Sequence, residues 1–84
     1  MAQMKSNEIK TASSSEILKA AKDSKGIKQA DLAARLGMAQ PSLSGNMNRT
    51  RIGLDVFARM LDAMGYDVIV KDRDSGKDLW KVEV

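Results

Sequence analysis

Residues 29–47, with the sequence QADLAARLGMAQPSLSGNM, constrain the fold more than any other part of the chain. Before Gly37 the apolar residues recur with helical spacing, and Ala30, Ala33 and Leu36 are predicted to share the inner side of a helix. Gly37 accepts a positive φ without a Cβ clash, so it can end this helix and redirect the chain. Ala33, one turn earlier, is small enough for a second helix to cross closely. The segment therefore predicts two short helices joined by a sharp turn.

The second helix is predicted to begin just after Ala39, because the missing N–H of Pro41 costs no hydrogen bond in the first turn. Met38 supplies an apolar anchor in the turn before it. Leu43 and Met47, four residues apart, form its inner side. The outward side then carries Gln40, Pro41, Ser44, Gly45 and Asn48.

This spacing resembles the helix-turn-helix of the Cro/C1-type, or XRE, family, and the resemblance extends from about Ser15 to Gly65. The matching residues are Gln29, Leu32, Ala33, Leu36, Gly37, Gln40, Pro41, Ser42, Leu43 and Ser44. The resemblance implies a mainly α, lambda-repressor-like domain of four helices, or of five, whose second motif helix lies in the major groove. It also implies a bacterial or phage-encoded protein that acts in the cytoplasm, at the nucleoid.

The resemblance implies two kinds of contact with double-stranded DNA. Bases are read from the outer side of the second motif helix, where the candidates are Gln40, Pro41, Ser44 and Gly45. Gln40 is the strongest of these, because one amide both donates and accepts and can bind adenine bidentately. Phosphates are contacted from the helix starts and from the loop after the second helix. The candidates there are Lys28, Gln29, Ser42, Asn48, Arg49, Thr50 and Arg51.

Gly45 departs from the family pattern, which usually has a long polar or basic side chain at this position. A glycine inside a helix costs about 1 kcal/mol relative to alanine. Its presence indicates either a close approach of the backbone to DNA or a helix that ends early. In both cases specificity would depend partly on DNA shape.

A further helix is predicted before the motif. Ser13 and Glu16 have the spacing of a capping box, and the helix runs from there to about Ser24. Its buried side consists of Ile17, Leu18 and Ala21. Three lysines recur every third residue on another side, where they form either a solvated face or phosphate contacts; they are Lys19, Lys22 and Lys25.

The helix predicted after the motif is the most regular segment of the chain. A single apolar stripe consists of Leu54, Phe57, Ala58, Leu61 and Met64, and Gly65 ends the helix. The apolar period then changes to 2, which predicts a β-hairpin over residues 66–84 with its turn at residues 72–77.

The predicted hairpin needs a partner surface, because two strands alone are barely stable in water. Part of this surface is expected to be the helix before it. We also expect the strand edge at residues 66–70 to pair with its counterpart in a second chain, which gives a homodimer. The candidate dimerisation residues are Tyr66, Val68, Val70, Trp80 and Val82.

Composition and charge limit the other possibilities. The chain of 84 residues has no cysteine and no histidine, which excludes disulfides, imidazole catalysis and ordinary zinc sites, so we expect no metal, cofactor or enzyme activity. No apolar run is long enough to span a membrane. Residues 1–53 carry nine basic and four acidic side chains, whereas residues 54–84 carry five and seven. The first part therefore suits a polyanion and the second does not.

These observations divide the chain into an arm (residues 1–12), a helix-turn-helix domain (13–65) and a hairpin (66–84). Lys5 and Lys10 of the arm either contact phosphates or belong to a frayed terminus. The expected function is that of a sequence-specific DNA-binding transcription regulator, a repressor by family analogy. Two alternatives stay open: an antitoxin whose C-terminal part binds a protein toxin, and a protein-interaction module that kept the fold.

Overall fold

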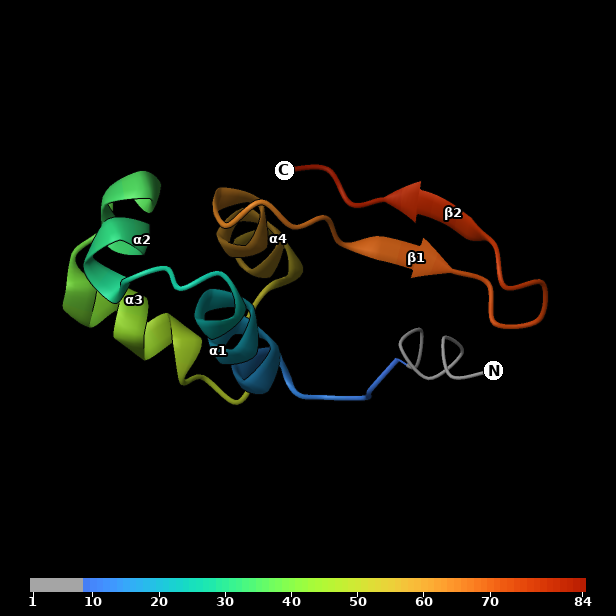
Figure 1. The fold of residues 1–84 in the computed structure, drawn as a ribbon, viewed down its shortest axis with the longest axis horizontal. Helices are drawn as coiled ribbons and strands as arrows, with labels where there is room; N and C mark the ends of the chain where they lie inside the picture. The colour runs from blue at the N-terminus through green and yellow to red at the C-terminus, as the bar shows by residue number, and fades with distance from the viewer. Residues whose placement is uncertain (1–8) are drawn as a thin grey trace.

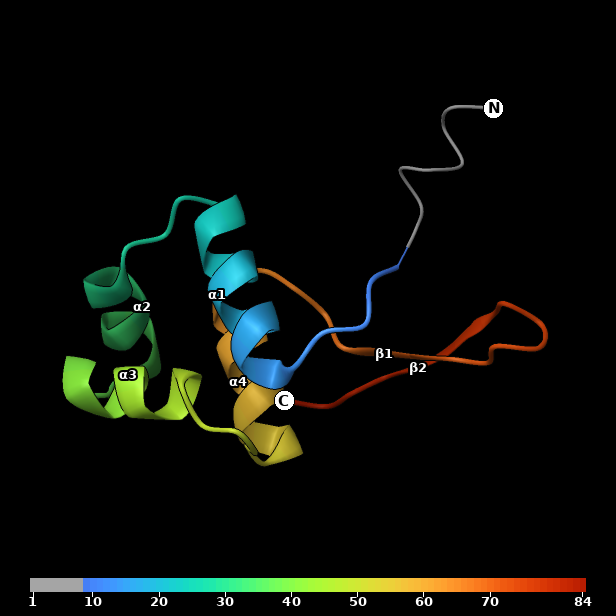
Figure 2. The same cartoon turned by 90° about the horizontal axis from the view of Figure 1, so that it is seen from below.

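The computed structural model describes residues 9–84, which form four helices followed by one antiparallel hairpin (Figure 1). The elements are α1 (Ser14–Ser24), α2 (Gln29–Leu36), α3 (Gln40–Met47), α4 (Leu54–Ala63), β1 (Ile69–Lys71) and β2 (Asp78–Lys81). The helices form one body, and the hairpin projects away from it in both views (Figures 1 and 2). The predicted mainly α fold with a C-terminal hairpin is confirmed.

The helix boundaries follow the local signals in the sequence. The Ser13 hydroxyl accepts from the Glu16 N–H at 3.2 Å, and the Glu16 carboxylate accepts from the Ser13 N–H at 2.9 Å. The Ser13 backbone N–H, and secondly its hydroxyl, hold the pKa of the Glu16 carboxyl below its ordinary value. At the end of α2, Gly37 has a φ of 65°, and the next N–H, that of Met38, bonds to the Ala33 carbonyl at 3.0 Å. The predicted capping box and glycine turn are therefore both present.

One hydrophobic cluster lies between the four helices. Each helix contributes one large side chain with no more than trace exposure, and these are Leu18, Leu32, Leu43 and Met60. Partly buried Ile27 and Met38 pack against the cluster from the connections. Because every helix is anchored in the same core, the orientation of α3 relative to the others is set by packing.

The predicted inner sides of two helices are wrong in part. Ala30 is exposed, whereas Leu32 is fully buried, and Leu54 is 60% exposed, whereas Met60 is fully buried. Since α4 packs against both α1 and α2, its buried arc is wider than one stripe and includes Met60. Leu54 is the first residue of α4, at the end of the helix and away from the core cluster.

The carboxyl end of α4 is held by two basic side chains from other helices. Lys25 Nζ donates to the carbonyl oxygens of Met64 (2.8 Å) and Gly65 (3.2 Å), and Arg35 Nη1 donates to that of Ala63 (3.0 Å). The last carbonyls of a helix have no partner within it, and positive charge suits this end of the helix dipole. These contacts tie the end of α4 to α1 and α2.

The hairpin is shorter than the sequence predicts. Tyr66 and Val68 precede β1 and pack against the helical core, and the Tyr66 hydroxyl donates to the Ala21 carbonyl at 3.1 Å. The Tyr66 ring also lies 4.1 Å from Lys25 Nζ, measured to the ring centroid. Within the hairpin Val70 pairs with Trp80, and a bulge follows Val70. The predicted strand edge at residues 66–70 is therefore wrong in its first half.

The expected support of the hairpin by the preceding helix is also largely missing. The two strands contact each other, and neither packs extensively against α4. Trp80 is 65% exposed and Val70 is 45% exposed, while Val82 is half-buried. The outer part of the hairpin therefore presents apolar side chains that none of the four described helices covers.

Candidate nucleic-acid interface

Helix α3 turns its apolar side to the core and its polar side outward. Leu43 and Met47 are buried, whereas Gln40, Pro41 and Ser42 are exposed in the first turn. The N-cap residue of α3 is an alanine, which makes no side-chain hydrogen bond to the helix. The first N–H groups of α3 therefore have no side-chain cap, and the predicted base-reading residues beside them are accessible.

The helix continues through Gly45 and ends at Met47, which excludes the alternative that it ends early. The Asn48 side chain donates to the Ser44 carbonyl at 2.8 Å and closes the last turn. Asn48 itself is exposed and Ser44 is half-buried. A Cβ built on Gly45 would meet no atom within 4 Å, so packing inside the protein does not require a glycine there. The close approach of the backbone to DNA stays a prediction.

A polar cleft of about 260 Å³ lies beside α3 and brings together three helices. Its lining residues are Lys19, Lys22, Asp23, Gln29, Ser44, Met47 and Asn48. Gln29 is the half-buried first residue of α2, and Lys28, the N-cap of that helix, makes no side-chain cap. The amide of Gln29 therefore lies where the uncapped N–H groups of α2 begin, which is the surrounding that a phosphate prefers.

The row of three lysines in α1 separates in the folded protein. Lys19 and Lys22 line the cleft, whereas Lys25 binds the end of α4. Lys22 Nζ lies 3.1 Å from the Asp23 carboxylate, which offsets part of its charge. Lys19 has no acidic partner within 4 Å among residues 9–84. Spacing in the sequence placed the three on one side, but it contained no signal for these different partners.

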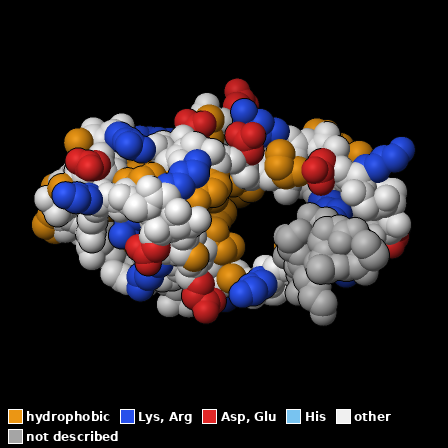
Figure 3. Space-filling view, viewed as in Figure 1, with side chains coloured by type: hydrophobic (Ala, Val, Ile, Leu, Met, Phe, Trp, Pro, Cys, Tyr) orange, Lys and Arg blue, Asp and Glu red, His pale blue; other side chains and the backbone are white. Residues whose placement is uncertain are grey.

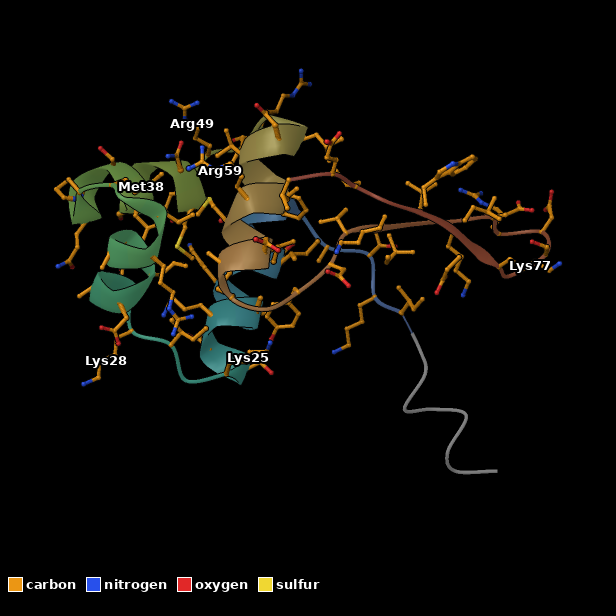
Figure 4. The ribbon with its side chains drawn as sticks, turned by 90° about the horizontal axis from the view of Figure 1, so that it is seen from above. Lys25, Lys28, Met38, Arg49, Arg59 and Lys77 are labelled. Carbon is orange, nitrogen blue, oxygen red and sulfur yellow. The ribbon has the colours of Figure 1, made fainter. Side chains whose placement is uncertain are left out.

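The loop between α3 and α4 carries a second group of cations. Arg49, Thr50 and Arg51 are all exposed, as is Lys28. In Figure 4, Arg49 and Lys28 point outward at opposite ends of the unit formed by α2 and α3. In the described part of the chain, no acidic side chain lies within 4 Å of the basic groups of Lys28, Arg49 and Arg51. Exposed guanidinium and ammonium groups of this kind are available to phosphate oxygens.

The residues predicted for the arm lie elsewhere. Lys10 lines a hollow next to Tyr66 and Asp67, on the hairpin side of the helices. Lys5 lies outside the described residues. The cations that surround α3 therefore come from α1, from the start of α2 and from the loop before α4.

Metal and membrane chemistry have no visible support in residues 9–84. No group of three acidic, cysteine or histidine side chains in this range could hold a metal ion. In the hairpin turn, the Asp72 carboxylate accepts a hydrogen bond from the Ser75 hydroxyl at 2.9 Å. This bond lowers the pKa of the Asp72 carboxyl, and a hydrogen bond from the Asp74 N–H lowers it further. Within the same range no helix is both long enough and apolar enough to cross a bilayer.

Two packed helices with a left-handed glycine between them, the second with its polar side exposed, define a helix-turn-helix protein. A family model described as helix-turn-helix matches residues 18–70, from α1 into β1. The chain belongs to this family, the Cro/C1-type or XRE group of DNA-binding transcription regulators. Comparisons with curated proteins and with solved structures gave no match.

Proposed function

We propose that this protein represses transcription by binding a specific site on double-stranded DNA as a homodimer. The observation that carries the proposal is the accessible polar side of α3 with cations around it: Lys19 lines the cleft beside α3, and Lys28 and Arg49 point outward at opposite ends of the α2–α3 unit. A reading helix between two groups of phosphate contacts has the arrangement needed to enter the major groove. A regulator of this kind acts by occupying DNA and needs no catalytic step.

Each part of the interface has a distinct role in this proposal. Gln40 reads a base, Pro41 contributes an apolar contact and Gly45 lets the backbone of α3 approach the groove. Phosphates on the two strands are contacted by two groups. The first group is Lys19, Lys28 and Gln29, and the second is Ser42, Asn48, Arg49, Thr50 and Arg51.

Two copies joined through their hairpins would present two α3 helices to one face of the duplex. Their half-sites would then lie about 10 base pairs apart, one helical turn. The exposed Trp80 and Val70 support such a contact, because they are paired across the hairpin and adjacent exposed apolar side chains mark an interaction surface.

An antitoxin is the second candidate, and the exposed apolar side chains of the hairpin, Trp80 and Val70, favour it. The apolar hairpin face projects away from α3, so a protein toxin could bind there while α3 remains on DNA. The two candidates differ in what the purified chain does alone. If the apolar face of the hairpin stays exposed in the pure protein, the antitoxin function is favoured. If a second copy of the chain covers this face, the repressor function is favoured.

The direct test is selection of bound duplexes from a random pool, followed by titration of the selected site at several salt concentrations. We expect a two-fold symmetric consensus. Replacing Arg49→Ala together with Arg51→Ala should reduce the log–log salt slope by about 1.8 per chain, because each lost phosphate contact contributes about 0.9. The matched control is Arg73→Ala with Lys77→Ala, which removes the same charge from the hairpin turn, far from α3 (Figure 4).

Equal salt slopes for these two double variants would overturn the proposed interface. A pool without enrichment would overturn sequence-specific binding and favour a protein-interaction module.

A further inference from the structure

A second surface lies on the hairpin side of α1 and α4. It is a hollow of about 460 Å³ whose walls are mostly apolar. Its apolar lining residues include Ile17 and Ala20 of α1, Leu61 of α4 and Tyr66, and its charged lining residues are Lys10, Glu16 and Asp67. Hydrophobic side chains border the opening between the helices and the hairpin in Figure 3. This surface is separate from the polar cleft beside α3.

The hairpin has an apolar face of its own. Val70 lies directly opposite Trp80, and the Val82 N–H donates to the Val68 carbonyl at 2.8 Å. Because side chains two residues apart share a face of a strand, these four side chains lie on the same face. Its outer end, Val70 and Trp80, is exposed.

The hollow matches the outer end of this face, Val70 and Trp80, in chemistry, but that outer end stays exposed. The Tyr66 hydroxyl is bonded to Ala21, and Lys25 binds Gly65 and covers the Tyr66 ring. These contacts fix the direction in which the chain leaves the helical body. The hairpin projects away from the helical body (Figure 2).

The geometry points to a second copy of this chain as the occupant of the hollow. The hairpin of each copy lies in the hollow of the other, so that Val70 and Trp80 contact the partner's Ile17, Ala20 and Leu61. A two-fold axis repeats the contact and covers both exposed apolar surfaces at once. The stretch from Asp67 to Asp72 reaches about 17 Å when extended, which is enough to cross a hollow of this size.

This exchange of hairpins differs from the pairing of strand edges that the sequence predicts. Edge pairing joins the β1 strands but does not fill either hollow. Exchange fills the hollow. It also does not need a long strand edge, which suits a β1 strand that begins only at Ile69. The inference rests on the homodimer of the proposed function and adds the surfaces by which its two copies meet.

The first test uses the only tryptophan of the chain, Trp80, as a reporter. Its emission should shift to shorter wavelength as protein concentration rises and the dimer forms. Ala20→Arg places a charge in the hollow, and it should raise the dimer dissociation constant by about tenfold or more, measured by sedimentation equilibrium. Ala34→Arg is the matched control, because Ala34 is also an exposed helical alanine but lies on α2. Ala20 is exposed as well, so neither variant should unfold, which circular dichroism checks.

The second test uses the absence of native cysteine, which makes introduced thiols unique. A chain with Ala20→Cys is mixed with a chain with Val70→Cys and oxidised. We expect mixed disulfide dimers to exceed those from Ala34→Cys with Val70→Cys. Because the two thiols are on different chains, any mixed product is intermolecular.

Three outcomes would overturn the exchange: a monomer at all concentrations, equal dimerisation of the two arginine variants, or Val70→Cys homodimers without mixed dimers, which indicates edge pairing. All readouts are made without DNA. A failed exchange therefore leaves DNA binding to be judged by the duplex selection, and failed DNA binding leaves the exchange intact.

Discussion

Lys19 and Lys25 belong to one row in the sequence, yet Lys19 lies within α1, Lys25 caps its carboxyl end, and the two have different surroundings in the folded chain. Lys19 lines the polar cleft beside α3, and Lys25 donates to the carbonyls of Met64 and Gly65. We expect Lys19→Ala to reduce the salt slope of DNA binding by about 0.9 per chain without changing thermal stability. Lys25→Ala should leave the slope unchanged and lower stability by roughly 1 kcal/mol, because two carbonyls lose a charged donor.

Fluorescence anisotropy at a series of salt concentrations measures the first effect, and thermal unfolding measures the second. If both substitutions changed the slope equally, the row would be a single phosphate-binding face and the separate roles would be wrong. The sequence predicts that the row shares one side of a helix, because that follows from spacing. It does not predict the partner of Lys25, which depends on where α4 ends in space.

In helix α3, replacing Gly45 should change both the stability of the protein and its binding to DNA. Gly45 is not among the glycines with positive φ, and an added Cβ would meet no atom within 4 Å. Gly45→Ala should therefore raise the free energy of unfolding by about 1 kcal/mol through helix propensity alone. If the α3 backbone approaches DNA closely, the same change should weaken DNA binding in spite of the added stability.

Calorimetry and binding titrations on one preparation separate these two effects. Gly37→Ala serves as the contrast, because its φ of 65° makes a side chain unfavourable and the protein should lose stability. A Gly45→Ala protein that is more stable and binds DNA as tightly as before would contradict the close approach.

Local signals predict the elements of this chain better than their buried sides. The capping box at Ser13, the turn at Gly37 and the change of period after Gly65 each depend on neighbouring residues, and the structure confirms all three elements. The burial of Met60 and the exposure of Leu54 depend on how α1 and α2 both cover α4, and one helical stripe holds no information on that. The sequence likewise predicts the hairpin as an element, but the support by α4 that it also predicts is largely missing.

At the scale of the whole molecule, stability should depend on protein concentration. The core is one small cluster, and the outer hairpin gains little from its own helices. If a second copy completes the fold, association stabilises the native state by mass action. The apparent melting temperature should then rise as the protein is concentrated, and calorimetry over about a hundredfold range of concentration measures this. The melting temperature of the Ala20→Arg chain should rise less with concentration. A melting temperature of the unmodified chain that does not depend on concentration would contradict stabilisation by a second copy.

The pinned root of the hairpin has a consequence for operator architecture. Tyr66 and Lys25 join the departing chain to α1, and α1 also borders the cleft beside the reading helix. The angle between the projecting hairpin and α3 is thus a property of a single protomer. In a symmetric pair, this angle would set the distance and the rotation between the two α3 helices. The number of base pairs between the two half-sites would then be determined by the protomer structure, independently of the DNA.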